Sequence, residues 1–422
     1  MALSLVMQLP DELFLEVLDH IPGLPRERQK TIINLSLTCK RFRPICLETL
    51  LVHPVLKISH VAHLIYQYFL NPTCISKVQT LEIISAIPTT FQPHTVGGTF
   101  LAPEKSHIFA SRKFQHFCTN IIYTCTSSPQ KQSTWIENLK NYSFDAYLGI
   151  LLAMFPNLQS LLLGPNFLHY YPVFNPLICD RAYEQNGVLC ALETQTPYLD
   201  NVLNHLQQNL SSLELPVLWN IKDMVYSPQD EHPEARNIQN HLAPISSQSL
   251  QHFTNLRELT LPCFAFGQYR AIRPMWDMQA KSVLPPNLET LRIVDAQHVP
   301  LAHFLRPILE SAHSLPSLKR VEVYFHDHLA YSGCTRRDER LQIYARTAGV
   351  KLWMRHPKGA GMRITPLMVS DLWMFREPVF DALAANGQPW RCGENDLLEF
   401  EKQAWNRRKE EEIAKLTLPA LD

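Results

Sequence analysis

The sequence predicts a mixed α/β protein, with a small helical unit ahead of an irregular repeat domain of short strands and helices. Two leucine-rich amphipathic segments within residues 1–51 indicate the helical unit. A recurring apolar phrase with the spacing of buried strand positions runs through residues 52–360. Residues 361–422 follow it, and we expect this third part, which ends in a strongly charged helix within Glu394–Leu416, to cap the repeat domain.

The first segment, Leu9–Ile21, has the pattern of an amphipathic helix. Pro10 is tolerated at a first helical position, and the carboxylates of Asp11 and Glu12 favour the positive end of the helix dipole. The proline and glycine of residues 22–25 stop the helix. One wide apolar face follows from the helical spacing of Leu13, Phe14, Val17, Leu18 and Ile21.

The second segment is expected to form one helix from Arg28 to Phe42, which Pro44 ends. One face of it carries Ile32, Leu35, Cys39 and Phe42. Leu37 lies on another face, and further apolar residues follow at Ile45, Leu47, Leu50 and Leu51. Two helices of this size have more apolar surface than they can bury in each other. They therefore either pack on the large domain or bind a partner.

The order of these residues resembles the F-box. The matching segments are Leu9-Pro10-x-Glu12-Leu13, Val17-Leu18 and Leu35-Ser36-Leu37-Thr38-Cys39-Lys40-Arg41-Phe42. Thr31 stands where the family usually has an acidic residue, and the connector 22–30 is long. The resemblance implies that the helices bind the Skp-type adaptor of a cullin–RING ubiquitin ligase. The residues that it implies for adaptor binding are Leu9, Pro10, Leu13, Val17, Leu18, Leu35, Leu37, Cys39 and Phe42.

The repeat domain is marked by the phrase apolar-x-x-apolar-x-apolar. The six occurrences begin at Val78, Asn157, Asn209, Asn255, Asn287 and Ser317. Four of them start with asparagine, more often than the frequency of asparagine in proteins would produce by chance. The phrase is similar to that of leucine-rich repeats, in which each copy supplies one short strand to a solenoid. We therefore expect an irregular leucine-rich-repeat-like α/β solenoid.

The spacing of the phrase is irregular. The first apolar residues, from Val78 to Leu318, are 80, 52, 46, 32 and 30 residues apart. Insertions are expected at Thr89–Ser111 and Ser227–Ser249, and such loops lie on the surface. Elements expected between and after the phrases are helices at Tyr198–Gln207 and His303–Ala312, and a last strand at Val350–Met354.

Strand alternation predicts a polar face opposite the core. It would carry Thr80 and Glu82, Ser160 and Leu162, Ser212 and Glu214, and six candidate target-binding residues: Glu258, Thr260, Thr290, Arg292, Arg320 and Glu322. Arg292 and Arg320 lie on adjacent predicted strands and are the one hint of a basic cluster that could read an acidic group such as phosphoserine. The alternative is a solvated face with incidental charges.

Composition narrows the function classes. The 39 lysines and arginines balance the 39 aspartates and glutamates, so the charge gives no argument for nucleic acid or a membrane surface as partner. The ten cysteines form no Cys-x-x-Cys pair, and we expect buried free thiols in a reducing compartment. With no secretory signal and no membrane-length apolar stretch, we expect a cytoplasmic or nuclear protein.

The sequence contains no motif for catalysis or cofactor binding, so we expect neither an enzyme nor a cofactor. His326 and His328 form the most metal-like pair, but no third ligand can be nominated. The leading hypothesis is a substrate receptor of a Skp–cullin–F-box ligase with an unknown protein target. The alternatives are an F-box scaffold without a degradation output, a hydrolase or metal enzyme with an unrecognised site, and helices that merely cap the large domain.

Overall fold

The computed structural model describes residues 9–21, 25–57, 60–84, 111–163, 171–177, 197–215, 250–262, 284–296, 298–310, 312–325 and 335–355. These residues form a mixed α/β protein, as the sequence predicts, and their strands make one eight-stranded parallel sheet. The strands follow one another in chain order from β1 to β8. Predictions for the insertions at 89–111 and 227–249, for His326 and His328, and for residues 361–422 lie outside the described residues or largely so.

The described part of the N-terminal unit consists of three helices, α2 (Asp11–Asp19), α3 (Pro25–Thr38) and α4 (Phe42–Val52). The single second helix predicted from Arg28 to Phe42 is therefore wrong at both ends. Pro44 does not end a helix; it lies in the first turn of α4. A proline is tolerated there because the amide hydrogen that it lacks has no partner within a first helical turn.

The sheet consists of β1 (Val55–Lys57), β2 (Thr80–Ile84), β3 (Ser160–Leu163), β4 (Ser212–Glu214), β5 (Glu258–Pro262), β6 (Thr290–Ala296), β7 (Arg320–Phe325) and β8 (Lys351–Arg355). The six apolar phrases of the sequence are strands β2 to β7, and β8 confirms the last predicted strand. Strand β1 was not predicted, since its three residues are too few to show a period.

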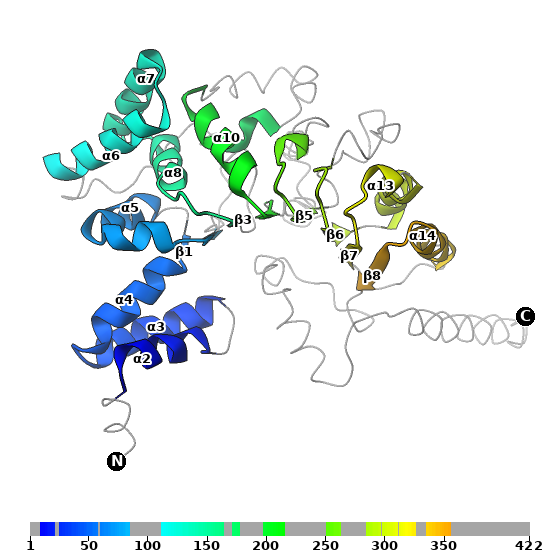
Figure 1. Ribbon diagram of the computed structural model, residues 1–422, viewed down its shortest axis with the longest axis horizontal. Helices are drawn as coiled ribbons and strands as arrows, with labels where there is room; N and C mark the ends of the chain where they lie inside the picture. Colours follow the sequence, from blue (N-terminus) through cyan, green and yellow to red (C-terminus); the bar gives the residue numbers. More distant parts are fainter. Residues whose placement is uncertain are drawn as a thin grey trace, which may run out of the picture.

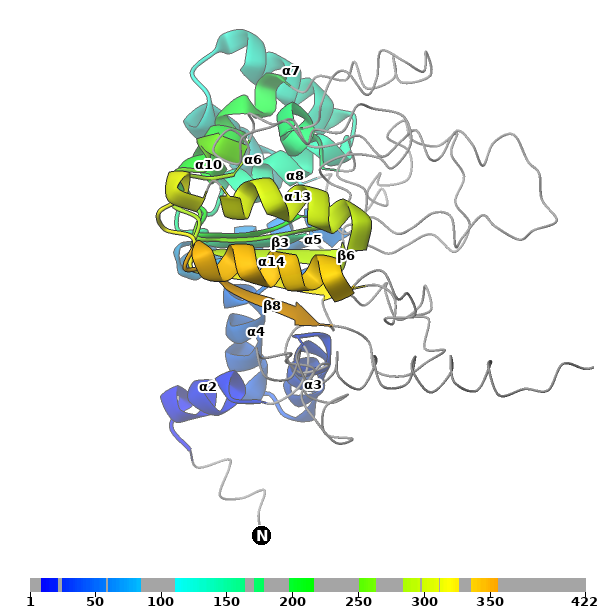
Figure 2. The ribbon, with the colours of Figure 1, turned by 90° about the vertical axis from the view of Figure 1, so that its right-hand side faces the viewer.

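The helices of the domain lie on the outer side of the curved row of strands (Figure 1). They are α5 (Val61–Leu70), α6 (Arg112–Cys125), α7 (Pro129–Lys140), α8 (Phe144–Ala153), α10 (Asp200–Asn209), α13 (His298–Glu310) and α14 (Thr335–Thr347). Short 3-10 helices lie at η2 (Pro72–Lys77), η7 (Pro172–Leu177), η9 (Pro197–Leu199), η11 (Leu250–His252) and η15 (Ala312–Ser314). Figure 2 shows α13 and α14 running alongside the strands.

The predicted alternation of the strands is confirmed. The core row, whose members pair across adjacent strands, consists of Leu81, Leu161, Leu213, Leu259, Leu291, Val321 and Leu352. All seven are buried in the main hydrophobic core, together with residues of the covering helices. The two predicted helices exist with shifted bounds, as α10 preceded by η9 and as α13. The 80-residue gap holds α6, α7 and α8.

The asparagines of the repeated phrase join one repeat to the previous one. The Nδ2 atom of Asn157 donates a hydrogen bond of 2.7 Å to the carbonyl of Ser76. Asn287 donates one of 2.7 Å to Thr254, and Asn255 donates to Gln208. Each acceptor lies four residues before the preceding strand begins, so the same bond recurs with the repeat. The side chain of Asn209 departs from this rule and bonds to His205.

We expect Asn287→Ala to lower the free energy of unfolding by about 0.5–1 kcal/mol, because it removes one hydrogen bond at an exposed site. Asn287→Asp keeps the shape of the side chain but not its donor, and should be at least as destabilising. Urea unfolding followed by circular dichroism measures both changes. An unchanged stability of the aspartate variant would show that the bond to Thr254 does not stabilise the stack.

The described cysteines are free thiols, and Cys46, Cys74 and Cys118 are buried, as predicted, whereas Cys39 and Cys125 are half-buried. Burial raises the pKa of the Cys118 thiol to about 12 and that of Cys46 above its ordinary value. Such thiols are held in the unreactive protonated form. Within the described ranges, the structure has no helix long and apolar enough to cross a membrane.

Candidate protein-binding surfaces

The N-terminal unit has a small hydrophobic core of its own. This core consists of Phe14, Leu18, Ile32, Phe42, Ile45 and Cys46, and it is separate from the main core of the domain. The rings of Phe14 and Phe42 stack at 4.3 Å between centroids. Arg41 fixes the start of α2 by donating to the carbonyl of Leu9 and pairing with Asp11 at 2.9 Å. The unit is thus folded without burying all of its apolar faces.

A short connection joins this unit to the sheet domain. Leu51, near the end of α4, already belongs to the main core. The Nε2 atom of Gln29 donates to the carbonyl of Val55 on the edge strand β1 at 2.5 Å. Lys77 on η2 forms a 2.5 Å ion pair with Glu48 on α4. Of these contacts only the bond from Gln29 comes from α3, and none comes from α2. Figure 1 shows where the two helices lie.

Exposed apolar side chains concentrate on the N-terminal unit. Seven large apolar side chains are exposed among the described residues, and four of them lie on α2 and α3. They form two pairs with i,i+4 spacing: Leu13 and Val17, which are 48% and 51% exposed, and Ile33 and Leu37, which are 43% and 78% exposed. We call these four residues the apolar pairs. Each pair lies on one side of its helix.

The predicted adaptor-binding residues divide into two groups. Pro10, Leu13, Val17 and Leu37 are exposed and can touch a partner. Leu18 and Phe42 are buried in the core of the unit, while Leu9, Leu35 and Cys39 are half-buried. These five support the surface more than they form it. Ile33 was missed, although its position four residues before Leu37 is a signal that periodicity alone could have provided.

The second surface is the face of the sheet opposite the core row, which we call the open face. Its two rows are Thr80, Ser160, Ser212, Glu258, Thr290, Arg320 and Lys351, and Glu82, Leu162, Glu214, Thr260, Arg292, Glu322 and Trp353. The six candidate target-binding residues thus lie together on β5, β6 and β7, in the predicted orientation. Four residues of the face are nevertheless buried: Glu82, Thr260, Thr290 and Glu322.

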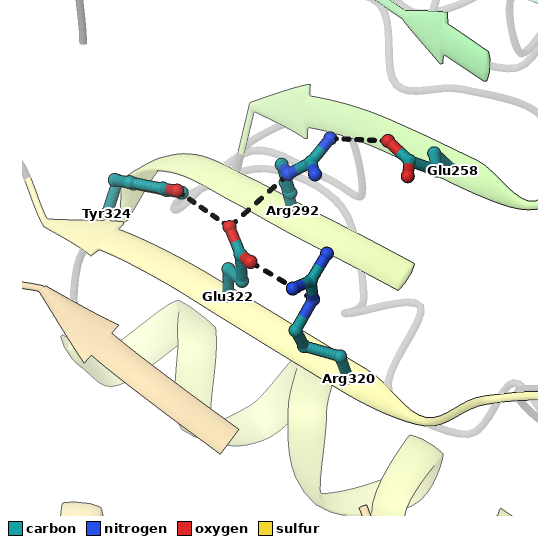
Figure 3. A network of polar contacts seen from close by, with 5 residues as sticks. All are labelled: Glu258, Arg292, Arg320, Glu322 and Tyr324. Carbon is teal, nitrogen blue, oxygen red and sulfur yellow. Dashed lines mark hydrogen bonds and ion pairs between the residues drawn. The ribbon is translucent and has the colours of Figure 1, made fainter. Parts of the chain in front are cut away.

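A polar network crosses β5, β6 and β7 on the open face (Figure 3). Arg292 bridges two carboxylates, with Nη1 at 2.8 Å from Glu258 and Nε at 3.3 Å from Glu322. Glu322 also lies 3.1 Å from Nε of Arg320 and accepts a 2.7 Å hydrogen bond from the hydroxyl of Tyr324. Glu322 is therefore the centre of the network, and three donors compensate the burial of its carboxylate.

The two arginines that hint at a basic cluster are engaged with carboxylates instead. Burial opposes the positive charge of Arg292, yet Glu258 and Glu322 outweigh it and raise the pKa of the guanidinium. Arg320 lies over the ring of Trp353, with its guanidinium carbon 5.3 Å from the ring centroid. A site for a phosphate dianion would need cations without such nearby carboxylates. Sequence spacing placed the arginines on adjacent strands but could not show that Glu322 lies between them.

No known protein family, curated protein or solved structure matches this chain. The arrangement of its own residues therefore carries the functional argument. Within the described ranges no group of three or more histidine, cysteine, aspartate or glutamate residues could hold a metal ion. The two candidate surfaces are therefore the apolar pairs on the N-terminal unit and the polar, charged open face of the sheet.

Proposed function

We propose that the chain is a substrate receptor of a Skp–cullin–F-box ubiquitin ligase. The N-terminal unit would be its F-box and would bind the Skp-type adaptor. The sheet domain would be a leucine-rich-repeat-like solenoid whose open face binds a target protein. A receptor of this kind performs no chemistry; it brings the target close to a ubiquitin-loaded conjugating enzyme, and the gain is proximity and orientation.

The observation that carries the proposal is the exposure of the apolar pairs on a unit that has its own core. The buried residues Phe14 and Leu18 of α2, Ile32 of α3 and Phe42 of α4 already hold the three helices together, so the outward side chains of α2 and α3 add little to their stability. Burying an exposed leucine-sized side chain contributes about 1.5–3 kcal/mol. Four such side chains therefore suffice for a specific association after the entropy cost of binding.

The repeat-like order of the sheet supports the second half of the proposal. Strands β2 to β8 pair in one register along the core row, with a shift only toward the end of the β6–β7 pair, and the asparagine bond recurs at three of their junctions. Stacked repeats of this kind present one continuous face built from equivalent positions. The open face is rich in polar and charged side chains, as expected of a surface that binds another protein specifically.

Replacing Leu13, Val17, Ile33 and Leu37 together by alanine should weaken binding to a Skp-type adaptor by at least about 100-fold. Co-expression followed by calorimetric titration of the purified chain with the adaptor measures this loss. The matched control replaces Leu70, Tyr123 and Ile343, which are equally exposed apolar residues on α5, α6 and α14. It should bind like the parent chain. Undiminished adaptor binding by the fourfold variant would refute the proposed surface.

The same fourfold variant separates a receptor from a scaffold. If the chain directs degradation, cells that express the variant in place of the parent chain should accumulate at least one protein, with a longer half-life. That protein should still bind the variant, since the open face is unchanged. Loss of adaptor binding with no change in any protein half-life would leave the scaffold as the function.

A further inference from the structure

Helices α5 and α6, on the outer side of the sheet, form a surface without carboxylates (Figure 1). No aspartate or glutamate lies within residues 49–81 or 105–136, which contain both helices. The basic groups of the surface are the exposed Arg112, Lys113 and His116 of α6 and the half-buried His63 of α5. Because the charges of the whole chain balance, this excess of positive charge is a local property of the two helices.

The two full positive charges of this surface are available to a partner. Arg112 and Lys113 are exposed, and no carboxylate of the described residues forms an ion pair with either of them. They occupy the first turn of α6, which contains no acidic residue. The positive end of the helix dipole repels cations at this place, so the two side chains lower the stability of the helix. Such an arrangement is expected where a binding partner supplies the negative charge.

Aromatic side chains join α5 to α6 beside these charges. The ring of Phe114 on α6 lies 5.4 Å from that of Tyr66 and 5.8 Å from that of Phe69, both on α5. Phe69 also lies 5.5 Å from Phe117 of α6. Tyr66, Phe69 and Phe117 are only partly buried. Next to them, Leu70 and Tyr123 are 53% and 52% exposed, which makes them two of the three exposed large apolar side chains described outside the N-terminal unit.

Each helix carries the same order of side chains along one side. A basic residue is followed one turn later by a partly exposed ring, and one turn after that by an aliphatic side chain. The order is His63, Tyr66 and Leu70 on α5, and Lys113, Phe117 and Ile121 on α6. We call these six residues, together with Arg112 and Tyr123, the aromatic seam.

We propose that the aromatic seam docks an acidic amphipathic segment of a partner protein, with carboxylates at Arg112 and Lys113 and apolar side chains against Leu70, Phe117 and Tyr123. This inference goes beyond the proposed function, because the seam shares no residue with the apolar pairs or the open face. An apolar patch beside unpaired charges is typical of a protein interface, and complementarity selects an acidic partner. Nucleic acid is disfavoured, because its affinity is built from many phosphate contacts and the seam offers two full positive charges.

The probe for the test is a phage-displayed library of random peptides, selected on the immobilised full chain. A charge variant, Arg112→Glu/Lys113→Glu, is used for counter-selection. Peptides that bind the parent chain but not this variant should be acidic and should contain leucine or aromatic residues. Fluorescence anisotropy of the synthetic peptides should give at least about tenfold weaker binding to the charge variant. A similar loss is expected for the apolar variant Leu70→Ser/Tyr123→Ser, which removes the exposed apolar contacts.

Two controls separate docking from net charge and from folding. Arg340→Glu/Lys351→Glu makes the same change of net charge at exposed residues of α14 and β8, and should bind the peptides as the parent chain does. The charge variant should unfold at the same temperature as the parent chain or at a higher one, because glutamates suit the positive end of α6. Circular dichroism of every variant checks the fold, so weaker binding by the charge variant would not reflect unfolding.

Three outcomes would overturn the inference. If no selected peptide were sensitive to the charge variant, or the sensitive peptides lacked acidic and apolar residues, the seam would not dock such a segment. Binding of oligouridylate RNA or of phosphatidylserine vesicles that only the charge variant loses would change the partner class. A dimer of the parent chain that the charge variant dissociates would make a second copy the occupant. The fourfold variant of the apolar pairs should keep peptide binding, so a failure here is distinguishable from a failure of the proposed ligase role.

Discussion

Trp135→Ala is expected to lower the free energy of unfolding by about 3–5 kcal/mol, the cost of a large cavity in a well-packed core. The Trp135 side chain is fully buried, and its Nε1 atom donates a 3.0 Å hydrogen bond to the carbonyl of Ala146. Its ring also contacts that of Tyr198 at 5.6 Å between centroids. The indole of α7 thereby packs against both α8 and η9, and alanine would remove these contacts.

Gly149 on α8 provides the complementary measurement. A Cβ atom at this position would lie 2.8 Å from Cζ2 of Trp135 and would also overlap Leu199. Gly149→Ala should therefore destabilise the parent chain by about 1–3 kcal/mol, although alanine is the better helix former. In a Trp135→Phe background the smaller ring leaves more space, and the same substitution should cost less.

Urea unfolding of the parent chain, Trp135→Phe, Gly149→Ala and the double variant gives the coupling free energy between the two sites. Circular dichroism is the suitable signal, because the chain has seven tryptophans and its fluorescence would report on all of them. A loss below about 1 kcal/mol for Trp135→Ala would show that the indole contributes little to the core. Additive effects of the two sites would assign the strain of Gly149→Ala to Leu199, the nearer side chain.

Glu322→Ala is expected to cost about 2–4 kcal/mol, because it removes the shared partner of two guanidinium groups and a hydroxyl at a buried position. Arg292 would keep Glu258, whereas Arg320 would keep only its contact with Trp353. Glu258→Ala is the matched control at the other end of the network. Its side chain is 42% exposed, so its loss should cost less than about 1 kcal/mol.

A double-mutant cycle of Glu322→Ala with Arg320→Met, followed by thermal and urea unfolding, isolates the pair. If Glu322 is a structural centre, the double variant should be more stable than the sum of the single losses predicts, because each single variant leaves one charge of the pair without the other. If Glu322→Ala and Glu258→Ala lowered the free energy of unfolding equally, burial of the carboxylate would not determine how much it stabilises the fold.

Much of the sheet could be read from the sequence because its signal is local and repeated. Leu81, Leu259 and Leu291 occupy one row of the core because each follows the same phrase, and side chains alternate along any strand. The asparagines at the start of the phrase were visible as a pattern. Their structural role, a hydrogen bond to a carbonyl of the previous repeat, is visible only in the stacked repeats of the structure.

Sequence pattern did not predict the elements whose formation depends on contacts with residues distant in the sequence. Strand β1 is too short to show a period and forms because β2 offers it a parallel partner. Phe42 was assigned to the end of a helix, but it begins α4, where it stacks on Phe14 of α2. The 80-residue gap between the phrases of β2 and β3 contains helices α6 to α8. The repeated strand phrase could not predict how these helices pack on α5 and on one another.

The sequence by itself determined where strands β2 to β8 lie, which side of each of them enters the core, and that the first fifty residues carry more apolar surface than two helices can bury. The tertiary structure decided how that surface is shared, with Leu18 and Phe42 inside and Leu13, Val17 and Leu37 outside. It also decided that Arg292 and Arg320 are paired with glutamates and are not a free basic cluster. Periodicity fixes the face on which a side chain lies, whereas burial and ion pairing depend on residues from other elements that only folding brings near.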